Sequence, residues 1–146
     1  MVLVIATCTS CADAAFFEQN KSIENRSWSY DNTKEFAVKI ADSTAKYDVF
    51  INLRHAAGYD FANIYLLLHQ QGAGLLDTAY RHEIALAARD GRWLGRSAGT
   101  LYEVQTLAYT DFVFPDTGIY RFTLEQNMRQ NPLAQIADVG IKLVKK

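Results

Sequence analysis

Residues 112–125, FVFPDTGIYRFTLE, indicate the fold more clearly than any other stretch of the chain. Apolar and polar side chains alternate from residue 120 to residue 125, and a period of two residues is typical of a strand with one buried face. The preceding run, residues 112–114, stops at Pro115, which cannot donate a hydrogen bond to a neighbouring strand. Residues 116–118, Asp-Thr-Gly, are typical of a tight turn. The stretch therefore predicts a β-hairpin whose second strand directs Tyr120, Phe122 and Leu124 into a core.

Similar strand patterns recur on both sides of this hairpin, separated by turn residues. Residues 36–41 and 102–107 show a two-residue alternation, and Val139, Ile141 and Leu143 predict the last strand near the end of the chain. Residues 47–53 and 64–68 are apolar runs of the length expected for buried strands. About eight strands result, which predicts an all-β fold, an antiparallel, jelly-roll-like β-sandwich.

Two segments are less clear. Leu75 to Ala88 fits a helix by its Ala and Leu content, but it also places Tyr80, His82, Ile84 and Leu86 on one side of a strand. We favour the strand, because an isolated helix between strands is less consistent with the rest of the pattern. Residues 127–136 contain Asn131-Pro132 and little periodicity, so we interpret them as a loop with room for one helical turn.

Composition limits the fold and the class of partner. The 146 residues suit one domain, and a hydrophobic content of 49% supports a core without metal or disulfide. Lys and Arg number 15 against 16 Asp and Glu, and they do not cluster. Because nucleic-acid binding depends on clustered basic residues, we expect no nucleic-acid partner.

The amino terminus resembles the end of a signal peptide. Residues 1–6 are almost wholly apolar, and small or hydroxylated residues lead to Cys11. We interpret Cys8-Thr9-Ser10-Cys11 as a lipobox in which the Cys11 thiol receives a diacylglyceryl group, although Cys8 stands where Leu is usual. The alternative, a redox or metal Cys-x-x-Cys motif, requires a βαβ frame or a second ligand pair, and the sequence has neither.

This interpretation divides the chain into three parts. Residues 1–10 are a short or truncated signal peptide, residues 11–30 a lipidated segment and tether, and residues 31–146 the β-sandwich domain. We therefore expect a membrane-anchored lipoprotein of the cell envelope, whose first partner is the lipid membrane reached through acylated Cys11.

Short motifs spread over nearly the whole chain have a specific order and spacing. They are Cys11 with Phe17, Ser27-Trp28, residues 49–55 with Tyr59 and Asn63, residues 90–95, Phe114-Pro115 with Gly118, Tyr120 and Phe122, Met128-Arg129, Pro132-Leu133, Ile136 and residues 138–140. Together they resemble the GldH family, lipoproteins of gliding bacteria of the Bacteroidetes type. The resemblance implies that Cys11 rather than Cys8 is modified and that residues 78–87 form a strand. It also implies association with other envelope proteins, those of the gliding machinery or a linked secretion apparatus.

Loop segments that match the family supply a candidate protein-contact site of charged and aromatic residues: Arg54, Asp90, Arg92, Trp93 and Arg129. Trp93 and Arg129 also have plainer structural interpretations. Trp93 suits a plug at one end of the sandwich, because Trp is highly buried on average. Met128 suits a cover over the core, with Arg129 paired to a carboxylate such as Asp138.

We expect no catalysis, metal or cofactor. No Gly-x-Ser-x-Gly turn or comparable setting surrounds a nucleophile, and His55, His69 and His82 lack ligand spacing. The functional alternative is a lipid-tethered carbohydrate-binding module that uses Trp93 with Tyr59, Tyr102 and Tyr109. A flat exposed row of these aromatics would favour sugar, whereas buried aromatics beside an exposed loop patch would favour a protein partner.

Overall fold

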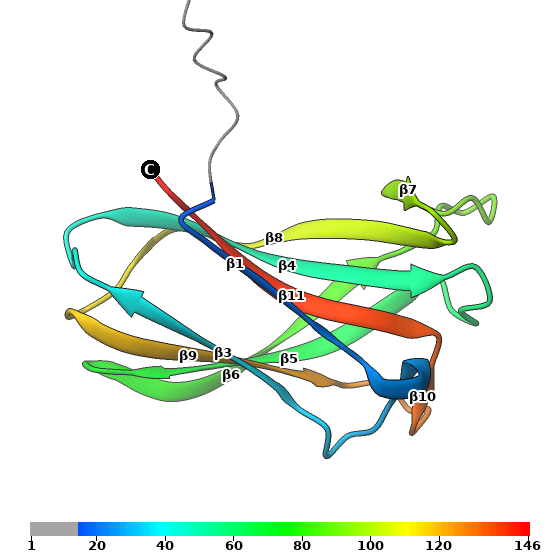
Figure 1. The fold of residues 1–146 in the computed structure, drawn as a ribbon, viewed down its shortest axis with the longest axis horizontal. Coiled ribbons are helices and arrows are strands. Elements are labelled where there is room, and N and C mark those ends of the chain that lie inside the picture. The colour runs from blue at the N-terminus through cyan, green and yellow to red at the C-terminus, as the bar shows by residue number, and fades with distance from the viewer. Residues whose placement is uncertain (1–14) are drawn as a thin grey trace, which may run out of the picture.

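Two antiparallel sheets lie face to face in the computed structural model, which describes residues 15–146 (Figure 1). The five-stranded sheet has the order β1 (Phe17–Ser22), β11 (Ile136–Lys145), β4 (Lys46–Ala56), β8 (Leu101–Val113) and β7 (Arg96–Ala98). The four-stranded sheet has the order β3 (Lys34–Ile40), β9 (Gly118–Gln126), β5 (Asn63–Gly72) and β6 (Leu75–Ala85). A small pair, β2 (Ser27–Trp28) with β10 (Leu133–Ala134), and the 3₁₀ turn η1 (Glu24–Arg26) complete the described elements.

The predicted hairpin strand lies at the centre of the core. Tyr120, Phe122 and Leu124 on β9 are 0% exposed, as the alternation predicted. The ring of Phe114 lies 4.6 Å from that of Tyr120, in the geometry that aromatic pairs prefer. The Tyr120 hydroxyl oxygen lies 2.7 Å from the carbonyl oxygens of both Ala73 and Asp116, within reach of its one proton, so this side chain ties together the turns before β6 and β9.

The all-β sandwich is confirmed, but eleven strands are present within the described residues rather than eight. The additional strands are short or polar. β1 pairs with β11 from Phe17 to Ser22, in a segment that the sequence assigned to the tether. Phe17 is the only large apolar side chain in this strand, so hydrophobic alternation does not reveal it. The folded domain therefore extends upstream of residue 31.

Leu75 to Ala88, whose pattern fits either a helix or a strand, forms the strand that we favoured. β6 pairs with β5 over residues 75–85, and Ile84 on its inner face is buried. The loop interpretation of residues 127–136 also agrees with the structure, except that Leu133–Ala134 form the short strand β10 and no helical turn occurs in this segment.

Nowhere in residues 15–146 does a helix reach the length and apolar character needed to cross a bilayer. The expected signal peptide and the lipidation site at Cys11 lie outside the described residues.

Candidate functional site

The structure separates the five predicted contact residues into three settings. Arg54 belongs to β4, Asp90, Arg92 and Trp93 belong to the turn after β6, and Arg129 belongs to the loop after β9. Only the turn after β6 and the loop after β9 adjoin each other, because Phe61 lies beside both.

Arg54 is held by the fold. It lies opposite Asp138 on β11, its Nε is 2.8 and 2.9 Å from the two carboxylate oxygens, and its second nitrogen is 2.6 Å from Oδ2. Such a two-pronged pair is among the strongest that side chains form. Hydrogen bonding and attraction from Asp138, with a smaller contribution from Glu103, raise the pKa of Arg54. The suggested pairing of Arg129 with Asp138 is therefore wrong, because Arg54 occupies that carboxylate.

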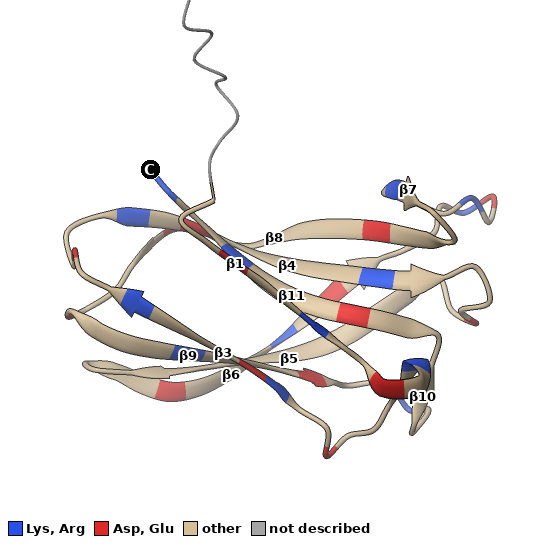
Figure 2. Ribbon diagram, in the orientation of Figure 1, with Lys and Arg blue, Asp and Glu red and all other residues tan. Residues whose placement is uncertain are grey.

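The pair belongs to a ladder of alternating charge on the outer face of the five-stranded sheet. Asp138, Arg54, Glu103 and Arg96 occupy directly opposed positions on β11, β4, β8 and β7. Figure 2 shows acidic and basic segments interspersed along these strands. Opposite charges facing each other across strands stabilise the pairing that brings them together. Arg54 thus supports the sheet and is not a free partner contact.

Next to the ladder, Asn52 of β4 is unusually buried for a side chain on the outer face of a sheet. Asn52 is 5% exposed; its amide nitrogen donates to Glu18 at 2.9 Å and Asn20 at 3.2 Å, and its oxygen accepts from Gln105 at 2.8 Å. Every polar atom of this side chain is therefore satisfied. Gly140 makes the network possible, because a methyl group there would overlap Asn20 Oδ1 and lie 2.5 Å from the Gln19 carbonyl oxygen.

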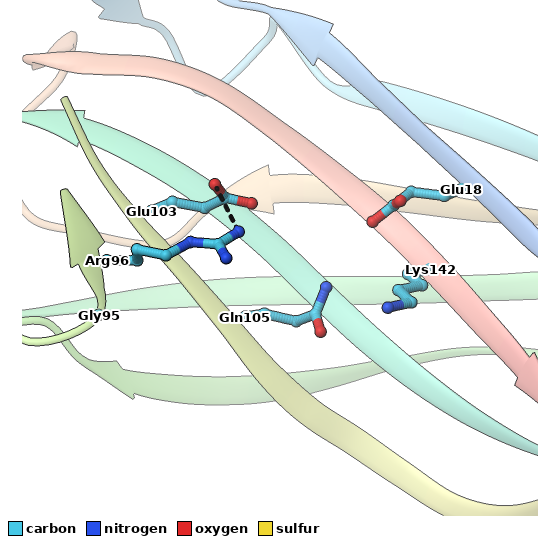
Figure 3. A pocket seen from close by; sticks show the side chains of 6 residues that line it. All are labelled: Glu18, Gly95, Arg96, Glu103, Gln105 and Lys142. Carbon is cyan, nitrogen blue, oxygen red and sulfur yellow. Dashed lines mark ion pairs between the residues drawn. The ribbon is translucent and has the colours of Figure 1, made fainter. Parts of the chain in front are cut away.

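A pocket of about 480 Å³ lies beside the Asn52 network. It is lined by Glu18, Gly95, Arg96, Glu103, Gln105 and Lys142 (Figure 3). Its charges balance, two acidic against two basic, and Arg96 lies 3.8 Å from Glu103. Because both signs are present and Arg96 is already paired with Glu103, this surface selects poorly between ligands and mainly supports the sheet.

Trp93 caps an aromatic cluster at one end of the sandwich. Its ring lies 4.5 Å from that of His55 and 5.9 Å from that of Tyr102, and it packs partly buried against the core. The plug interpretation is therefore correct, but one side of Trp93 also lines an open depression with Tyr59, Phe61 and Arg89. This depression has a volume of about 330 Å³.

His55 is 0% exposed beneath this plug. Its Nδ1 lies 2.9 Å from the Ala56 carbonyl oxygen, and its Nε2 has no hydrogen-bond partner among the described residues. Desolvation by burial lowers the pKa of His55 below the ordinary value of 6.5, against a smaller opposing effect of the Ala56 hydrogen bond. His55 is therefore a neutral structural residue at physiological pH.

Asp90 and Arg92 shape the turn that carries Trp93. The Asp90 carboxylate accepts a hydrogen bond from the Arg92 backbone N–H at 3.0 Å, and the Ala88 backbone N–H donates to the Arg92 carbonyl at 2.8 Å. Asp90 is thus a turn-forming residue of the Asx type. The Arg92 side chain is exposed beside it.

Arg129 lines a groove of about 360 Å³ with Phe61, Tyr65, Arg81, Asn127, Met128 and Gln130. The Arg81 guanidinium lies 4.0 Å from the centre of the Tyr65 ring, a cation–π contact that fixes its position. None of the described residues that line the groove carries a carboxylate. The groove therefore combines two cations with an apolar floor.

The loop that carries Arg129 is held from below by Gln126, which is 0% exposed. The Gln126 amide oxygen accepts from the Met128 N–H at 2.8 Å, and its nitrogen donates to the Gln130 carbonyl at 3.1 Å. Met128 packs against the core, as predicted, and its sulfur accepts from the Tyr65 N–H at 3.2 Å. The loop is therefore fixed in shape before any partner binds.

Phe61, 36% exposed, lines both the Trp93 depression and the Arg129 groove, which makes them one continuous surface. We call it the loop-end surface and define it by Phe61, Tyr65, Arg81, Arg89, Trp93, Met128 and Arg129. Sequence reasoning found Trp93, Met128 and Arg129 but missed the others. Tyr65 and Arg81 lie on strands β5 and β6, and their nearness depends on the β5–β6 register, which the sequence alone does not give.

The aromatics proposed for sugar binding do not form a flat exposed row in the described structure. Tyr59 is 5% exposed, Tyr102 packs on His55 and Trp93, and Tyr109 packs against His82 and Phe112. This arrangement favours a protein partner over a sugar. Among residues 15–146, no three His, Cys, Asp or Glu side chains gather as a metal site would require.

Comparisons with known proteins agree with this assignment. Residues 15–143 match the family described as GldH lipoprotein. The chain is 29% identical to a gliding motility lipoprotein GldH homolog of Christiangramia forsetii, covering 99% of this chain and 92% of that protein. It is 26% identical to the gliding motility lipoprotein GldH of Flavobacterium johnsoniae, covering 100% of this chain and 94% of that protein. No solved structure matches significantly. Since the family match spans almost the whole described fold, the chain belongs to the GldH lipoprotein family.

Proposed function

We propose that this protein is a non-catalytic component of the gliding machinery or of a linked secretion apparatus, and that its loop-end surface binds another envelope protein. As a member of a lipoprotein family it is a membrane-anchored protein of the cell envelope. The observation that carries the proposal is the composition of the loop-end surface, in which Trp, Tyr, Met and three Arg side chains surround exposed Phe61 and outnumber the one carboxylate beside it, Asp60. These residue types are enriched in the cores of protein interfaces.

The geometry suits binding better than catalysis. Arg81 is fixed by Tyr65, and the Arg129 loop is fixed by Gln126, so the surface loses little conformational entropy on association. The groove places no nucleophile beside a base, because its polar side chains are arginines, amides and the Tyr65 phenol, none of which is a general base at neutral pH. The matching partner presents an apolar side chain to Phe61 and carboxylates to Arg81 and Arg129.

Charge reversal tests the partner site. Arg129→Glu and Arg81→Glu should abolish co-purification of envelope partners with the tagged protein, and in a gliding strain they should impair spreading. Arg96→Glu is the matched control, because Arg96 is 83% exposed on the other sheet and outside the loop-end surface. Complementation of a deletion strain by the Arg81→Glu/Arg129→Glu double variant at normal protein levels would reject the site.

We further propose that the chain is anchored through acylated Cys11, with residues 1–10 removed as a signal peptide. Cys11→Ser should release the protein from the membrane fraction, since a thiol is needed to receive the acyl chains, each CH₂ of which contributes ~0.8 kcal/mol of membrane affinity. Cys8→Ser is the matched control and should leave the protein membrane-bound. Retention of Cys11→Ser after a carbonate wash, or release of Cys8→Ser, would contradict the assignment.

A further inference from the structure

The two ends of the sandwich differ, and the chain enters the fold at one of them. Phe16 precedes β1, and its ring lies 5.2 Å from that of Tyr47 at the start of β4. Trp93 packs on His55, near the end of the same strand. Figure 1 shows the described chain beginning beside its C-terminus, whereas the loops after β6 and β9 lie at the other end. The loop-end surface is therefore remote from the point where the chain enters the fold.

The segment between Cys11 and the fold is too short to turn the loop-end surface toward a membrane. Cys11 precedes Phe16 by five residues, which span at most roughly 18 Å when fully extended. Tyr47 and His55 are eight positions apart on β4, a separation of roughly 26 Å at about 3.3 Å per residue. A chain anchored through Cys11 therefore cannot stand on its loop-end surface. This step rests on the acylation of Cys11 proposed above.

The end where the chain enters the fold exposes large apolar side chains. Phe16 precedes β1 there, and Val113 lies at the end of β8. Leu76 follows the β5–β6 turn and is 83% exposed, and Ile119 lies at the start of β9. These four are half of the eight exposed large hydrophobic side chains among residues 15–146, so this end is apolar where the chain leaves it for the anchor.

Contacts between the turns hold these side chains around one tip of the sandwich. A methyl group on Gly74, in the β5–β6 turn, would lie 3.0 Å from the Pro115 side chain, so the turns before β6 and β9 pack together. The ring of Phe114 lies 5.3 Å from that of Tyr47, on which Phe16 packs. The exposed apolar residues thus belong to one rigid end and are not scattered over the molecule.

Two lysines flank the apolar side chains. Lys39 lies opposite Ile119 on β3, and Lys46 lies opposite Val113 on β4. Both are exposed, and neither makes an ion pair within the part of the chain that the structure describes, whereas the two lysines at the C-terminus are paired with carboxylates. Lysine beside apolar residues suits a bilayer surface, because its stem covers apolar groups while its ammonium reaches the phosphates.

We propose that this end of the sandwich rests on the lipid bilayer. The contact is an anchor-end surface, defined by Phe16, Leu76, Val113 and Ile119 with Lys39 and Lys46. Its apolar side chains lie at the boundary between headgroups and acyl chains. The acyl chains hold the protein at the membrane, and the anchor-end surface sets its orientation. The loop-end surface then faces away from the membrane, so the protein bound there meets it in the aqueous compartment.

Tryptophan quenching by brominated lipid measures which end touches the bilayer. Both native tryptophans lie at the loop end, Trp28 beside Leu133 of β10 and Trp93 in the turn after β6. The full-length chain, purified from membranes and reconstituted into vesicles of brominated phosphatidylcholine, should therefore emit as it does in unbrominated vesicles. Val113→Trp should lose its added emission in the brominated vesicles, with a shift of the maximum to shorter wavelength. Leu76→Trp should behave in the same way.

Leu107→Trp is the matched control. Leu107 lies on β8 like Val113 and is equally exposed, at 48%, but it is six positions nearer the loop end, roughly 20 Å. Its added emission should persist in brominated vesicles. Equal quenching of Leu107→Trp and Val113→Trp would show that the domain lies on its side and would overturn the proposal. So would quenching of the native tryptophans, or unquenched emission from both Val113→Trp and Leu76→Trp. Circular dichroism of each variant checks that the domain remains folded.

Flotation of the chain with the vesicles separates this proposal from the two on which it borders. A chain that does not float would reject the acylated anchor and this inference with it. A chain that floats with the wrong residues quenched would reject the orientation alone. The Arg81→Glu/Arg129→Glu variant should keep the quenching pattern of Val113→Trp when combined with it, because both arginines lie in the loop-end surface.

Discussion

Replacing Arg54 should destabilise the fold, whereas replacing Arg129 should not. Arg54→Met keeps the apolar stem of the side chain but leaves the Asp138 carboxylate, which is 6% exposed, without its three short contacts. An exposed ion pair contributes about 0 to 1 kcal/mol, and removal of one partner of a fully buried pair costs about 3 to 5 kcal/mol. The Arg54 side chain is 42% exposed, so solvent screens the pair in part and we expect a cost of roughly 2 kcal/mol.

Urea unfolding of Arg54→Met, Asp138→Asn and the double variant measures this cost and the coupling between the two residues. A loss of roughly 2 kcal/mol corresponds to a fall in melting temperature of roughly 5 to 8 °C for a domain of this size. Arg129→Met is the control and should stay within about 0.5 kcal/mol of the wild type. An unchanged midpoint for Arg54→Met, or additive single effects with no coupling, would show that the pair does not support the sheet.

Three further substitutions test the core, the Asn20 network and the two histidines whose pKa is lowered. Phe122→Ala should cost roughly 3 to 5 kcal/mol in urea unfolding, because the side chain is 0% exposed, whereas Ile119→Ala, 54% exposed, should cost far less. Gly140→Ala should cost roughly 1 to 3 kcal/mol by pushing β1 away from β11, and Gly58→Ala, where the nearest side-chain atom is 3.6 Å away, is the control. Burial lowers the pKa of His55 and His82 below 6.5, so the unfolded chain binds more protons and stability should fall as pH decreases below 6.5. His82→Gln should reduce this pH dependence in melting curves between pH 7.5 and pH 5, and an equal dependence in the variant would contradict the assignment.

The sequence predicted the fold where one face of a strand is buried. Tyr120, Phe122 and Leu124 alternate with polar residues because β9 has the core on one side and solvent on the other. β6 was identified on a different ground, the inconsistency of an isolated helix between strands, because Ile84 is its one buried side chain. Hydrophobic alternation did not reveal β1, because Phe17 is the one large apolar side chain in this strand. Only the pairing of β1 with β11 in the structure identifies it as a strand.

The candidate site was predicted less well, because contacts between strands depend on register. Arg54 and Asp138 are 84 positions apart in sequence, and no local pattern distinguishes Asp138 as the partner of Arg54 rather than of Arg129. Likewise, Arg81 joins Tyr65 only because β5 and β6 pair antiparallel. Trp93 was assigned correctly as a plug, since average burial is a property of the residue type itself.

The arginines of this chain show why residue type alone is a poor guide to a binding surface. Arg54 and Arg96 point onto acidic neighbours in the charge ladder, and Arg121 lies 3.1 Å from Glu35. Among the described residues, Arg81 and Arg129 make no ion pair, yet they line one groove beside exposed Phe61. A cation without a carboxylate partner keeps its full capacity for a charged ligand, and a fixed position lowers the entropic cost of using it. The loop-end surface is therefore where an acidic partner gains most, and the ladder is where it would have to displace bonds that the fold already makes.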